Sequence, residues 1–449
     1  MPATSLPNAQ AHLSSRPVYV HSFFSRKAQA PNVSNASRNR QLRTAFTYLL
    51  SGVFISQLII LVTTPMVSRL YSVSDIGQLN ALLAMAGSLV PFITLALPRI
   101  IVPSTDDGEA VLLAHRGIQI SIALCALLFG LMLILMVWPG TDFSLKVGGI
   151  WLWLPLITLI QSLSYILTAT VLRSRTYRLL SLRPGAQSLT TGVAQVSASL
   201  LGSNSGLLAA GEALGRGLGL ALLVRPYLAL RRKSDVLRAS PRVLRRHLAL
   251  VARVLPASAL DILATSFLVL SALFFYGDEI AGYVGMTQRL LAVPVALIGA
   301  ALGQSLLAEF AHSRRSHEDF PGLRRLVIAL CLFALAFALG IGLFGPWIFE
   351  TFLGAEWRPA GEFARLIAVP ASVAIVWNPL SAIALSLSKW GFLIKISLLR
   401  VLLAGCISIV SFHLGADWFV ALSLLVASGA IVQLAGLLAI RKFVRELKD

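Results

Sequence analysis

The feature that most constrains this chain is a series of long apolar stretches that recurs from about residue 45 to about residue 440. A helix needs about 20 predominantly apolar residues to cross the hydrocarbon core of a membrane. Twelve stretches of that length can be marked, and no segment between them exceeds about 45 residues. With 57% hydrophobic and 13% charged residues among 449, the chain is expected to be an all-α polytopic membrane protein. A soluble enzyme, a disordered scaffold and a secreted disulfide domain are excluded.

Basic residues predict the orientation of these spans. The spans are expected at 45–68, 77–98, 116–138, 149–171, 185–203, 206–224, 254–275, 281–303, 326–345, 362–386, 393–413 and 418–440. If the N-terminus is cytosolic, 31 of the 38 Lys and Arg residues fall on the cytosolic side and 4 on the other, the rest lying within spans. Lys and Arg remain in the cytosol during insertion. We therefore expect an inner-membrane, multi-pass protein with both termini in the cytosol, and this topology accounts for the net charge of +19 without nucleic acid as a partner.

Composition divides the chain into five expected parts. Residues 1–43 hold six basic and no acidic residues, and they lack the apolar core of a secretory signal. We interpret them as a disordered basic cytosolic tail, with an organellar transit peptide or a start codon placed too far upstream as alternatives. An N-terminal six-helix bundle (44–225), a basic cytosolic linker (226–253), a C-terminal six-helix bundle (254–440) and a second cytosolic tail (441–449) follow.

The two expected bundles carry a repeated pattern. YSVSDIGQLNALLAMAGSLVPFI, which begins at Tyr71, is similar to YGDEIAGYVGMTQRLLAVPVALI, which begins at Tyr276. In each, a Tyr and an acid precede an Ile and a Gly and then a helix with one Pro, and the two Tyr residues are 205 positions apart. Two halves with the same orientation predict a pseudo-two-fold axis along the membrane normal, as in many transporters.

Ionisable residues within the spans are the candidate functional groups. A charge in hydrocarbon costs about 3 kcal/mol or more, so such residues normally face the bundle interior or a water-filled cavity. Glu212 and Arg216 are one helical turn apart and can pair, beside a stripe of Gly at 211, 215 and 219 that favours close helix packing. Two interpretations stay open for them, namely a structural pair and a role with the substrate or a coupling ion.

Asp261 and Arg289 lack an opposite charge nearby on their own helices. Asp261 is a candidate site for H⁺ or Na⁺, unless an Arg of another helix pairs with it. Arg289 lies too deep to reach the interface and matches phosphate oxygens with its planar guanidinium. Pairing of Arg289 with Asp261 across the bundle is the alternative.

Further polar residues interrupt the spans. Arg69 is a second candidate phosphate ligand or, equally, an interfacial anchor. Gln57 and Asn80 are candidates for hydrogen bonds to sugar hydroxyls, as are Gln161, Gln195 and Asn378, although contacts between helices are the commoner use of such residues. The sequence shows no HExxH, GxSxG or P-loop motif and no metal-ligand spacing, so we expect no enzyme activity, no ATPase and no bound cofactor.

Four separated motifs resemble bacterial polysaccharide flippases of the O-antigen, lipopolysaccharide (Wzx-like) type. That family shows a P-x-x-[ST]-R-L-Y-[ST]-x-x-[DE]-[FI]-G run, which stands here from Pro65 to Gly77. The other similar segments are RSRTYRLLSLRPGAQS (173–188), YVGMTQRLLAVPVALIGAALGQSL (283–306) and FGPWIFETFLGAEWRPAGEFARLIAVP (344–370). The match covers about residues 45–440, and the tail before it is not part of the family pattern.

The resemblance implies two six-helix bundles and export of undecaprenyl-pyrophosphate-linked oligosaccharide by alternating access, within the multidrug/oligosaccharidyl-lipid/polysaccharide exporter superfamily. The partners it implies are the lipid-linked glycan, membrane lipid and polysaccharide polymerase or chain-length proteins. A drug/cation antiporter of the same superfamily is one alternative. A membrane glycosyltransferase or O-antigen polymerase is a weaker one, because the expected outer loops are short.

Overall fold

The computed structural model describes residues 35–104, 106–137, 149–174, 176–233, 242–316, 321–386 and 390–445, and all of its regular structure is helical. The chain divides into two compact units, Met1–Arg43 and Thr44–Asp449. The helices of the first half are α2 (Asn35–Leu70), α3 (Val73–Ile93), α4 (Pro98–Ile101), α5 (Asp107–Val137), η1 (Gly149–Trp153), α7 (Leu154–Arg173), α8 (Tyr177–Ala198) and α9 (Ser205–Lys233). Those of the second half are α10 (Arg242–Tyr276), α11 (Asp278–Ser316), α12 (Pro321–Leu353), η3 (Ala355–Trp357), α13 (Arg358–Ser386), α14 (Trp390–His413) and α15 (Trp418–Arg445).

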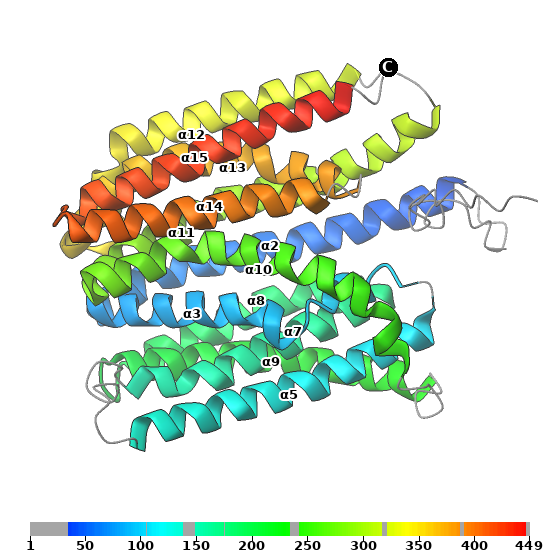
Figure 1. Cartoon of the computed structure of the whole chain (residues 1–449), viewed down its shortest axis with the longest axis horizontal. Helices are drawn as coiled ribbons and strands as arrows, with labels where there is room; N and C mark the ends of the chain where they lie inside the picture. The colour runs from blue at the N-terminus through cyan, green and yellow to red at the C-terminus, as the bar shows by residue number, and fades with distance from the viewer. Residues whose placement is uncertain are drawn as a thin grey trace, which may run out of the picture. The chain divides into compact units, whose positions relative to one another are not determined.

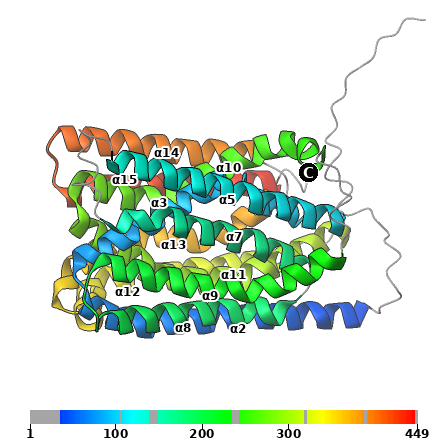
Figure 2. The ribbon, with the colours of Figure 1, turned by 90° about the horizontal axis from the view of Figure 1, so that it is seen from below.

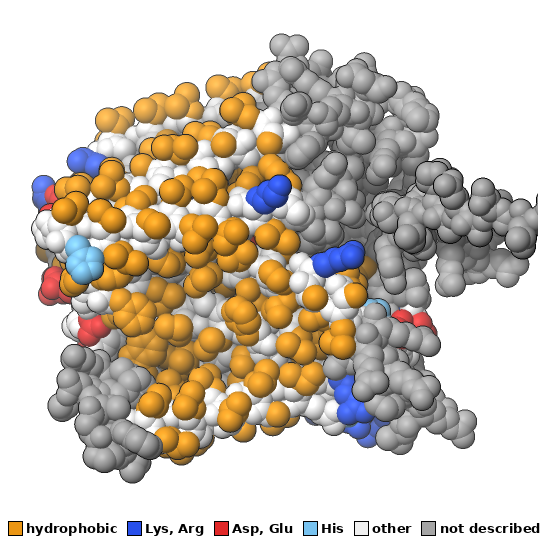
Figure 3. Space-filling model, viewed as in Figure 1, with side chains coloured by type: hydrophobic (Ala, Val, Ile, Leu, Met, Phe, Trp, Pro, Cys, Tyr) orange, Lys and Arg blue, Asp and Glu red, His pale blue; other side chains and the backbone are white. Residues whose placement is uncertain are grey.

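The long helices make this a multi-pass membrane protein. Each of the twelve expected spans coincides with a helix, and within the described residues eleven of these helices are long and apolar enough to cross a membrane. The twelfth is α8, whose polar side chains lower its hydropathy. The view in Figure 3 shows hydrophobic side chains spread over the face between two rims where charged side chains gather. The expected all-α fold class is confirmed.

Helix packing repeats between the two halves. In the first half α7 packs against α5 and α9, and α8 packs against α9. In the second half α13 packs likewise against α12 and α15, and α14 packs against α15. Figures 1 and 2 show the helices of residues 44–449 running side by side along one direction. The order of the helices within each half is therefore the same, as the sequence repeat predicts.

The contact between α3 and α11 shows the two-fold relation most directly. Neither Gly77 nor Gly282, which are 205 residues apart, has room for a side chain. A Cβ atom at Gly77 would lie 1.9 Å from the backbone oxygen of Asp278, and one at Gly282 would lie 2.3 Å from that of Val73. Val73 and Asp278 are again 205 apart. Gly77 thus contacts Asp278, the equivalent of Val73, while Gly282, the equivalent of Gly77, contacts Val73. Such a reciprocal contact is two-fold symmetric.

This symmetric contact belongs to a closed end of the interface between the halves, which we call the α2–α3 end. The Ser68 hydroxyl donates to the carbonyl oxygen of Leu353 at 3.0 Å, and the Trp357 indole donates to the carbonyl oxygen of Ser68 at 3.3 Å. Gln78 Nε2 donates to an Asp278 carboxylate oxygen at 2.6 Å. Backbone-to-backbone approach and these bonds hold the two halves together at this end, which the expected topology places outside the cell.

Tyr71, the first residue of the repeat, is buried at the same end. Its hydroxyl donates to the carbonyl oxygen of Gln195 at 2.7 Å, which joins the turn after α2 to α8. Burial, followed by the nearby carboxylate of Asp75, raises the pKa of the Tyr71 phenol. The protonated phenol is the form that donates the hydrogen bond, so burial and the bond favour the same state.

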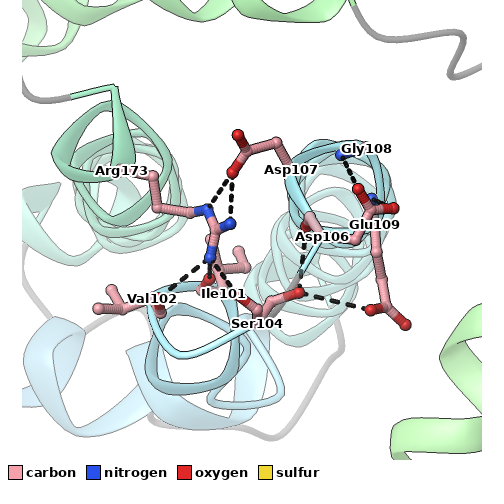
Figure 4. Close-up of polar contacts among 8 residues, drawn as sticks. All are labelled: Ile101, Val102, Ser104, Asp106, Asp107, Gly108, Glu109 and Arg173. Carbon is pink, nitrogen blue, oxygen red and sulfur yellow. Dashed lines mark hydrogen bonds and ion pairs between the residues drawn. The ribbon is translucent and has the colours of Figure 1, made fainter. Parts of the chain in front are cut away.

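At the opposite end, which we call the α9–α10 end, an arginine at the end of α7 forms several polar contacts. The Arg173 guanidinium pairs with Asp107 and donates to the backbone carbonyls of Ile101, Val102 and Ser104 (Figure 4). A guanidinium at a helix C-terminus satisfies carbonyls that have no partner within the helix. Arg173 therefore fixes the turn from α4 to α5.

Helical structure extends beyond two of the expected boundaries. The expected linker at 226–253 is mostly helical, because α9 continues to Lys233 and α10 begins at Arg242. Helix α2 begins at Asn35, so residues 35–43 of the expected disordered tail are helical. Residues 1–34 and 446–449 of the two expected tails lie outside the described residues.

Candidate functional site

A cavity of about 480 Å³, which we call the central cavity, lies between the two halves. Helices α2, α3, α8 and α9 of the first half and α10 and α11 of the second half line it. Its polar lining residues are Thr63, Asn80, Gln187, Ser188, Thr191, Glu212, Arg216, Thr265, Ser266, Gln288 and Arg289. Polar groups from six helices that converge on one cavity in an apolar protein mark a candidate binding site.

Helix α9 brings the charged pair Glu212 and Arg216 to the cavity. A carboxylate oxygen of Glu212 lies 2.6 Å from Nε of Arg216, and Glu212 is 6% exposed. The two residues are one helical turn apart and share a face. The expected pair is therefore present, and it lines the cavity.

The neighbouring stripe of Gly on α9 seats helix α8. A Cβ atom at Gly215 would lie 1.9 Å from the Thr191 hydroxyl, and Cβ atoms at Gly211 and Gly219 would lie 2.7 Å from Gln195 and 2.9 Å from Gln187. The close packing predicted from this stripe is confirmed, and it holds the polar face of α8 against the cavity.

Helix α11 brings Arg289 to the cavity from the second half. Arg289 has no hydrogen-bond partner among the residues that the structure describes, and it interacts electrostatically with Glu212 and Arg216. The guanidinium is thus held near one carboxylate that already has an arginine partner. Its donors are free to bind an anionic group in the cavity.

A third arginine, Arg183 on α8, was not expected at this site. It interacts electrostatically with Arg216, its Nη1 donates to the Thr168 hydroxyl at 2.8 Å, and its buried Nε has no partner. The expected topology places this residue in the cytosolic turn before the span at 185–203, whereas α8 begins at Tyr177. The signal was present, because Arg183, Gln187, Thr191 and Gln195 recur every four residues and form one helical face.

The resulting charge is positive. Two arginines, Arg216 and Arg289, line the cavity against one carboxylate, that of Glu212, which leaves an excess of one positive charge in the lining. Arg183 does not line the cavity, but it adds a further positive charge that acts on Arg216. The Asn80 amide adds a buried Nδ2 donor that has no partner. Uncompensated buried charge and unpaired buried donors are costly unless a ligand satisfies them.

The remaining candidates lie elsewhere. Arg69 is exposed at the end of α2 and donates to the carbonyl oxygen of Thr351 at 3.3 Å, a contact that fits the anchor interpretation. Gln57 is half-buried on α2 and is not among the residues that line the cavity. Gln195 Nε2 donates to the Leu208 carbonyl at 3.3 Å and so joins two helices, whereas the side chain of Asn378 lies outside the described residues.

Asp261 faces a different arginine from the one considered in the sequence analysis. Its carboxylate is 3.9 Å from the Arg99 guanidinium of α4, and the two side chains are 55% and 39% exposed. The hypothesis of a pair between Asp261 and Arg289 is therefore not what the structure shows. Asp261 instead links α10 to the first half near the α9–α10 end, where His247 of the same helix also lies 3.0 Å from Glu109.

No protein-family model and no curated protein sequence matches the chain. Solved structures of similar fold do exist. The chain is similar to a D35N mutant of the Vibrio cholerae MATE transporter VcmN, with 17% identity and a TM-score of 0.56 over 92% of this chain and 99% of that one. It is also similar to a MATE-family multidrug resistance transporter of the MOP superfamily in an inward-facing conformation, with 17% identity and a TM-score of 0.59 over 90% and 95% of the two chains.

A third similar structure is a MOP superfamily transporter from Pyrococcus furiosus, with 14% identity and a TM-score of 0.58 over 90% of this chain and 96% of that one. The reverse polarity of its binding pocket is described as suggesting a different function for that protein. At these identities the likeness establishes the fold, which is that of MATE transporters of the MOP superfamily.

Proposed function

We propose that this protein is a transporter that moves an undecaprenyl-pyrophosphate-linked oligosaccharide across the inner membrane by alternating access, for surface polysaccharide synthesis. The observation that carries the proposal is the positive excess of the central cavity. A pyrophosphate esterified at both ends has one negative charge on each phosphorus atom. Arg216 and Arg289 line the cavity against the single carboxylate of Glu212, and the nearby Arg183 adds a third guanidinium that acts on Arg216, so the site favours such an anion.

The rest of the cavity fits the other parts of such a cargo. Amides and hydroxyls of Asn80, Gln187, Ser188 and Gln288 offer donors and acceptors to sugar hydroxyls. A lateral opening between the two helix bundles would leave the polyisoprenyl tail in the lipid during transport. The closed α2–α3 end gives one of the two states that alternating access requires, and separation of Gly77 from Gly282 would give the other.

A drug/cation antiporter is the competing function, because one of the similar structures is that of a multidrug resistance transporter. A cationic substrate needs carboxylates that are free to bind it. The one carboxylate that lines the described cavity, Glu212, already pairs with Arg216. The Pyrococcus furiosus transporter with a pocket of reversed polarity indicates that this fold also accommodates other functions.

The test uses purified protein in proteoliposomes with a fluorescent undecaprenyl-pyrophosphate-linked glycan. Translocation is measured as the fraction that a membrane-impermeant quencher reaches, and bond formation is measured by chromatography of the lipid. We expect translocation without chain growth. If the glycan is not translocated and a lipophilic cation is exported under an H⁺ or Na⁺ gradient, the result supports the antiporter. Chain growth would support a polymerase.

A further inference from the structure

A second cavity, of about 300 Å³, lies within the second half of the chain, and we call it the C-half cavity. Helices α10, α11, α13, α14 and α15 line it, mostly with Ala, Leu, Val and Ile side chains. It adjoins the central cavity, because Thr265 and Gln288 line both. Its own polar groups are Arg400, Ser428 and Gln433.

Arg400 gives this cavity an unbalanced positive charge. Among the described residues, no carboxylate lines the cavity and none forms a hydrogen bond with Arg400. The acid that acts on it electrostatically is Asp261, which already lies 3.9 Å from Arg99. A guanidinium in an apolar cavity needs a counter-charge and acceptors for its N–H groups.

Gln433 supplies a second unsatisfied group in the same cavity. It is 9% exposed, and its Oε1 atom is buried with no hydrogen-bond partner in the described part of the chain. A half-turn of the amide exchanges its oxygen and nitrogen, which brings two N–H donors to the same place. A guanidinium and an amide that are both free to donate form the donor set of an anion site.

We propose that the C-half cavity binds a small monovalent inorganic anion, such as chloride, through the guanidinium of Arg400 and the amide of Gln433. One arginine balances one negative charge, whereas a pyrophosphate group would leave negative charge uncompensated in an apolar cavity. The proposal does not depend on the cargo of the central cavity.

The test measures thermal unfolding of the purified protein in choline chloride and in choline gluconate at equal ionic strength. A ligand that binds the folded state stabilises it, so we expect chloride to raise Tm by about 2 °C with saturation. Arg400→Gln should abolish the rise, and Gln433→Leu should reduce it. Lys395→Gln removes an exposed cation from the same helix and should leave the rise unchanged.

Bromide-soaked crystals of the unaltered protein provide a second measurement that does not require a variant to fold. An anomalous peak beside Arg400 would support the site. No chloride-dependent rise in the unaltered protein, or an undiminished rise in Arg400→Gln, would overturn the proposal. If inorganic pyrophosphate rather than chloride raises Tm and Arg400→Gln abolishes that effect, the cavity belongs to the cargo site and the proposal is wrong.

Discussion

Helices α3 and α11 occupy equivalent places in the two halves, yet they differ in charge where they border the central cavity. Near the α2–α3 end they match, since Gly77 and Gly282 make the same contact with each other's helix. Two turns further along, the residue equivalent to Arg289 at the same offset of 205 is Ala84. Both line the cavity. The repeat therefore sets the shape of the interface, whereas its departures from symmetry set the charge that a substrate meets.

Gly77→Ala disrupts the symmetric contact between α3 and α11, and we expect it to have the largest effect on transport. The new Cβ atom would lie 1.9 Å from the Asp278 backbone oxygen, so the halves must separate at the α2–α3 end. Such overpacking costs about 1–3 kcal/mol, and transport should fall below detection. Thermal unfolding and translocation at matched expression measure both effects.

Gly87→Ala on the same helix is the matched control, because a Cβ atom there meets nothing within 4 Å. Alanine is a better helix former than glycine, so this variant should be as stable as the unaltered protein or more stable. Equal activity of Gly77→Ala and Gly87→Ala would mean that the close contact is not needed for transport.

The difference in charge between α3 and α11 is tested first by removing the side chain of Arg289. Arg289→Ala should insert normally and lose about 100-fold in translocation, because charged hydrogen bonds contribute about 1.5–3 kcal/mol each. Arg289→Lys should recover part of the activity, since a point charge replaces a bidentate donor. Arg253→Ala, which removes an exposed arginine of α10, is the control. Full activity of Arg289→Ala would rule out its role in binding.

Substitutions of Glu212 and Arg216 on α9 change the charge of the central cavity in opposite directions, and we expect smaller effects from them. Glu212→Gln raises the positive excess of the central cavity, so inorganic pyrophosphate should bind about tenfold more tightly, which corresponds to about 1.4 kcal/mol. Arg216→Gln should weaken binding by a similar factor. Calorimetric titration measures both, with the exposed Glu350→Gln as control. Weaker binding by Glu212→Gln would show that this carboxylate does not oppose the anion.

The smallest effect on substrate binding is expected at the α9–α10 end, far along the helices from the contact of α3 with α11. Arg173→Ala leaves the carbonyls of Ile101, Val102 and Ser104 without their donor, and stability should fall by about 1–3 kcal/mol. The cavity charge is unchanged, so pyrophosphate affinity should persist. Arg116→Ala, which loses one exposed bond to Gln119, serves as control in the same unfolding assay. A loss of affinity without a loss of stability would contradict this structural role.

Local sequence patterns predicted the helices, their repeat and the contacts within one helix. Hydrophobic runs predict the spans, the Gly stripe on α9 predicts close packing against a neighbouring helix, and the four-residue spacing predicts the pair of Glu212 with Arg216. These features depend on neighbours in the sequence. The pair of Asp261 with Arg99 depends on the path of α10 past the first half, which no local pattern encodes.

Arg183 was missed for a different reason. A boundary drawn from hydropathy placed the start of the expected span at 185, because the start of α8 is polar. Polar residues lowered the hydropathy at the start of α8, so Arg183 fell outside the expected span. Gln187 and Thr191, which lie on the same helix face as Arg183, line the cavity. Hydropathy is thus least informative where a helix lines a polar site, and the spacing of polar residues is the better guide there.

We propose that the two-fold interface encloses a cavity whose arginines bind a pyrophosphate group. This proposal is tested by translocation of the lipid-linked glycan by the Ala84→Arg, Arg289→Ala double variant, which moves the guanidinium to the equivalent place on α3. We predict at least about a tenth of the activity of the unaltered protein, which is about 1.4 kcal/mol of lost stabilisation, against almost none for Arg289→Ala and for Ala84→Gln, Arg289→Ala. An inserted double variant that is as inactive as Arg289→Ala would contradict the account.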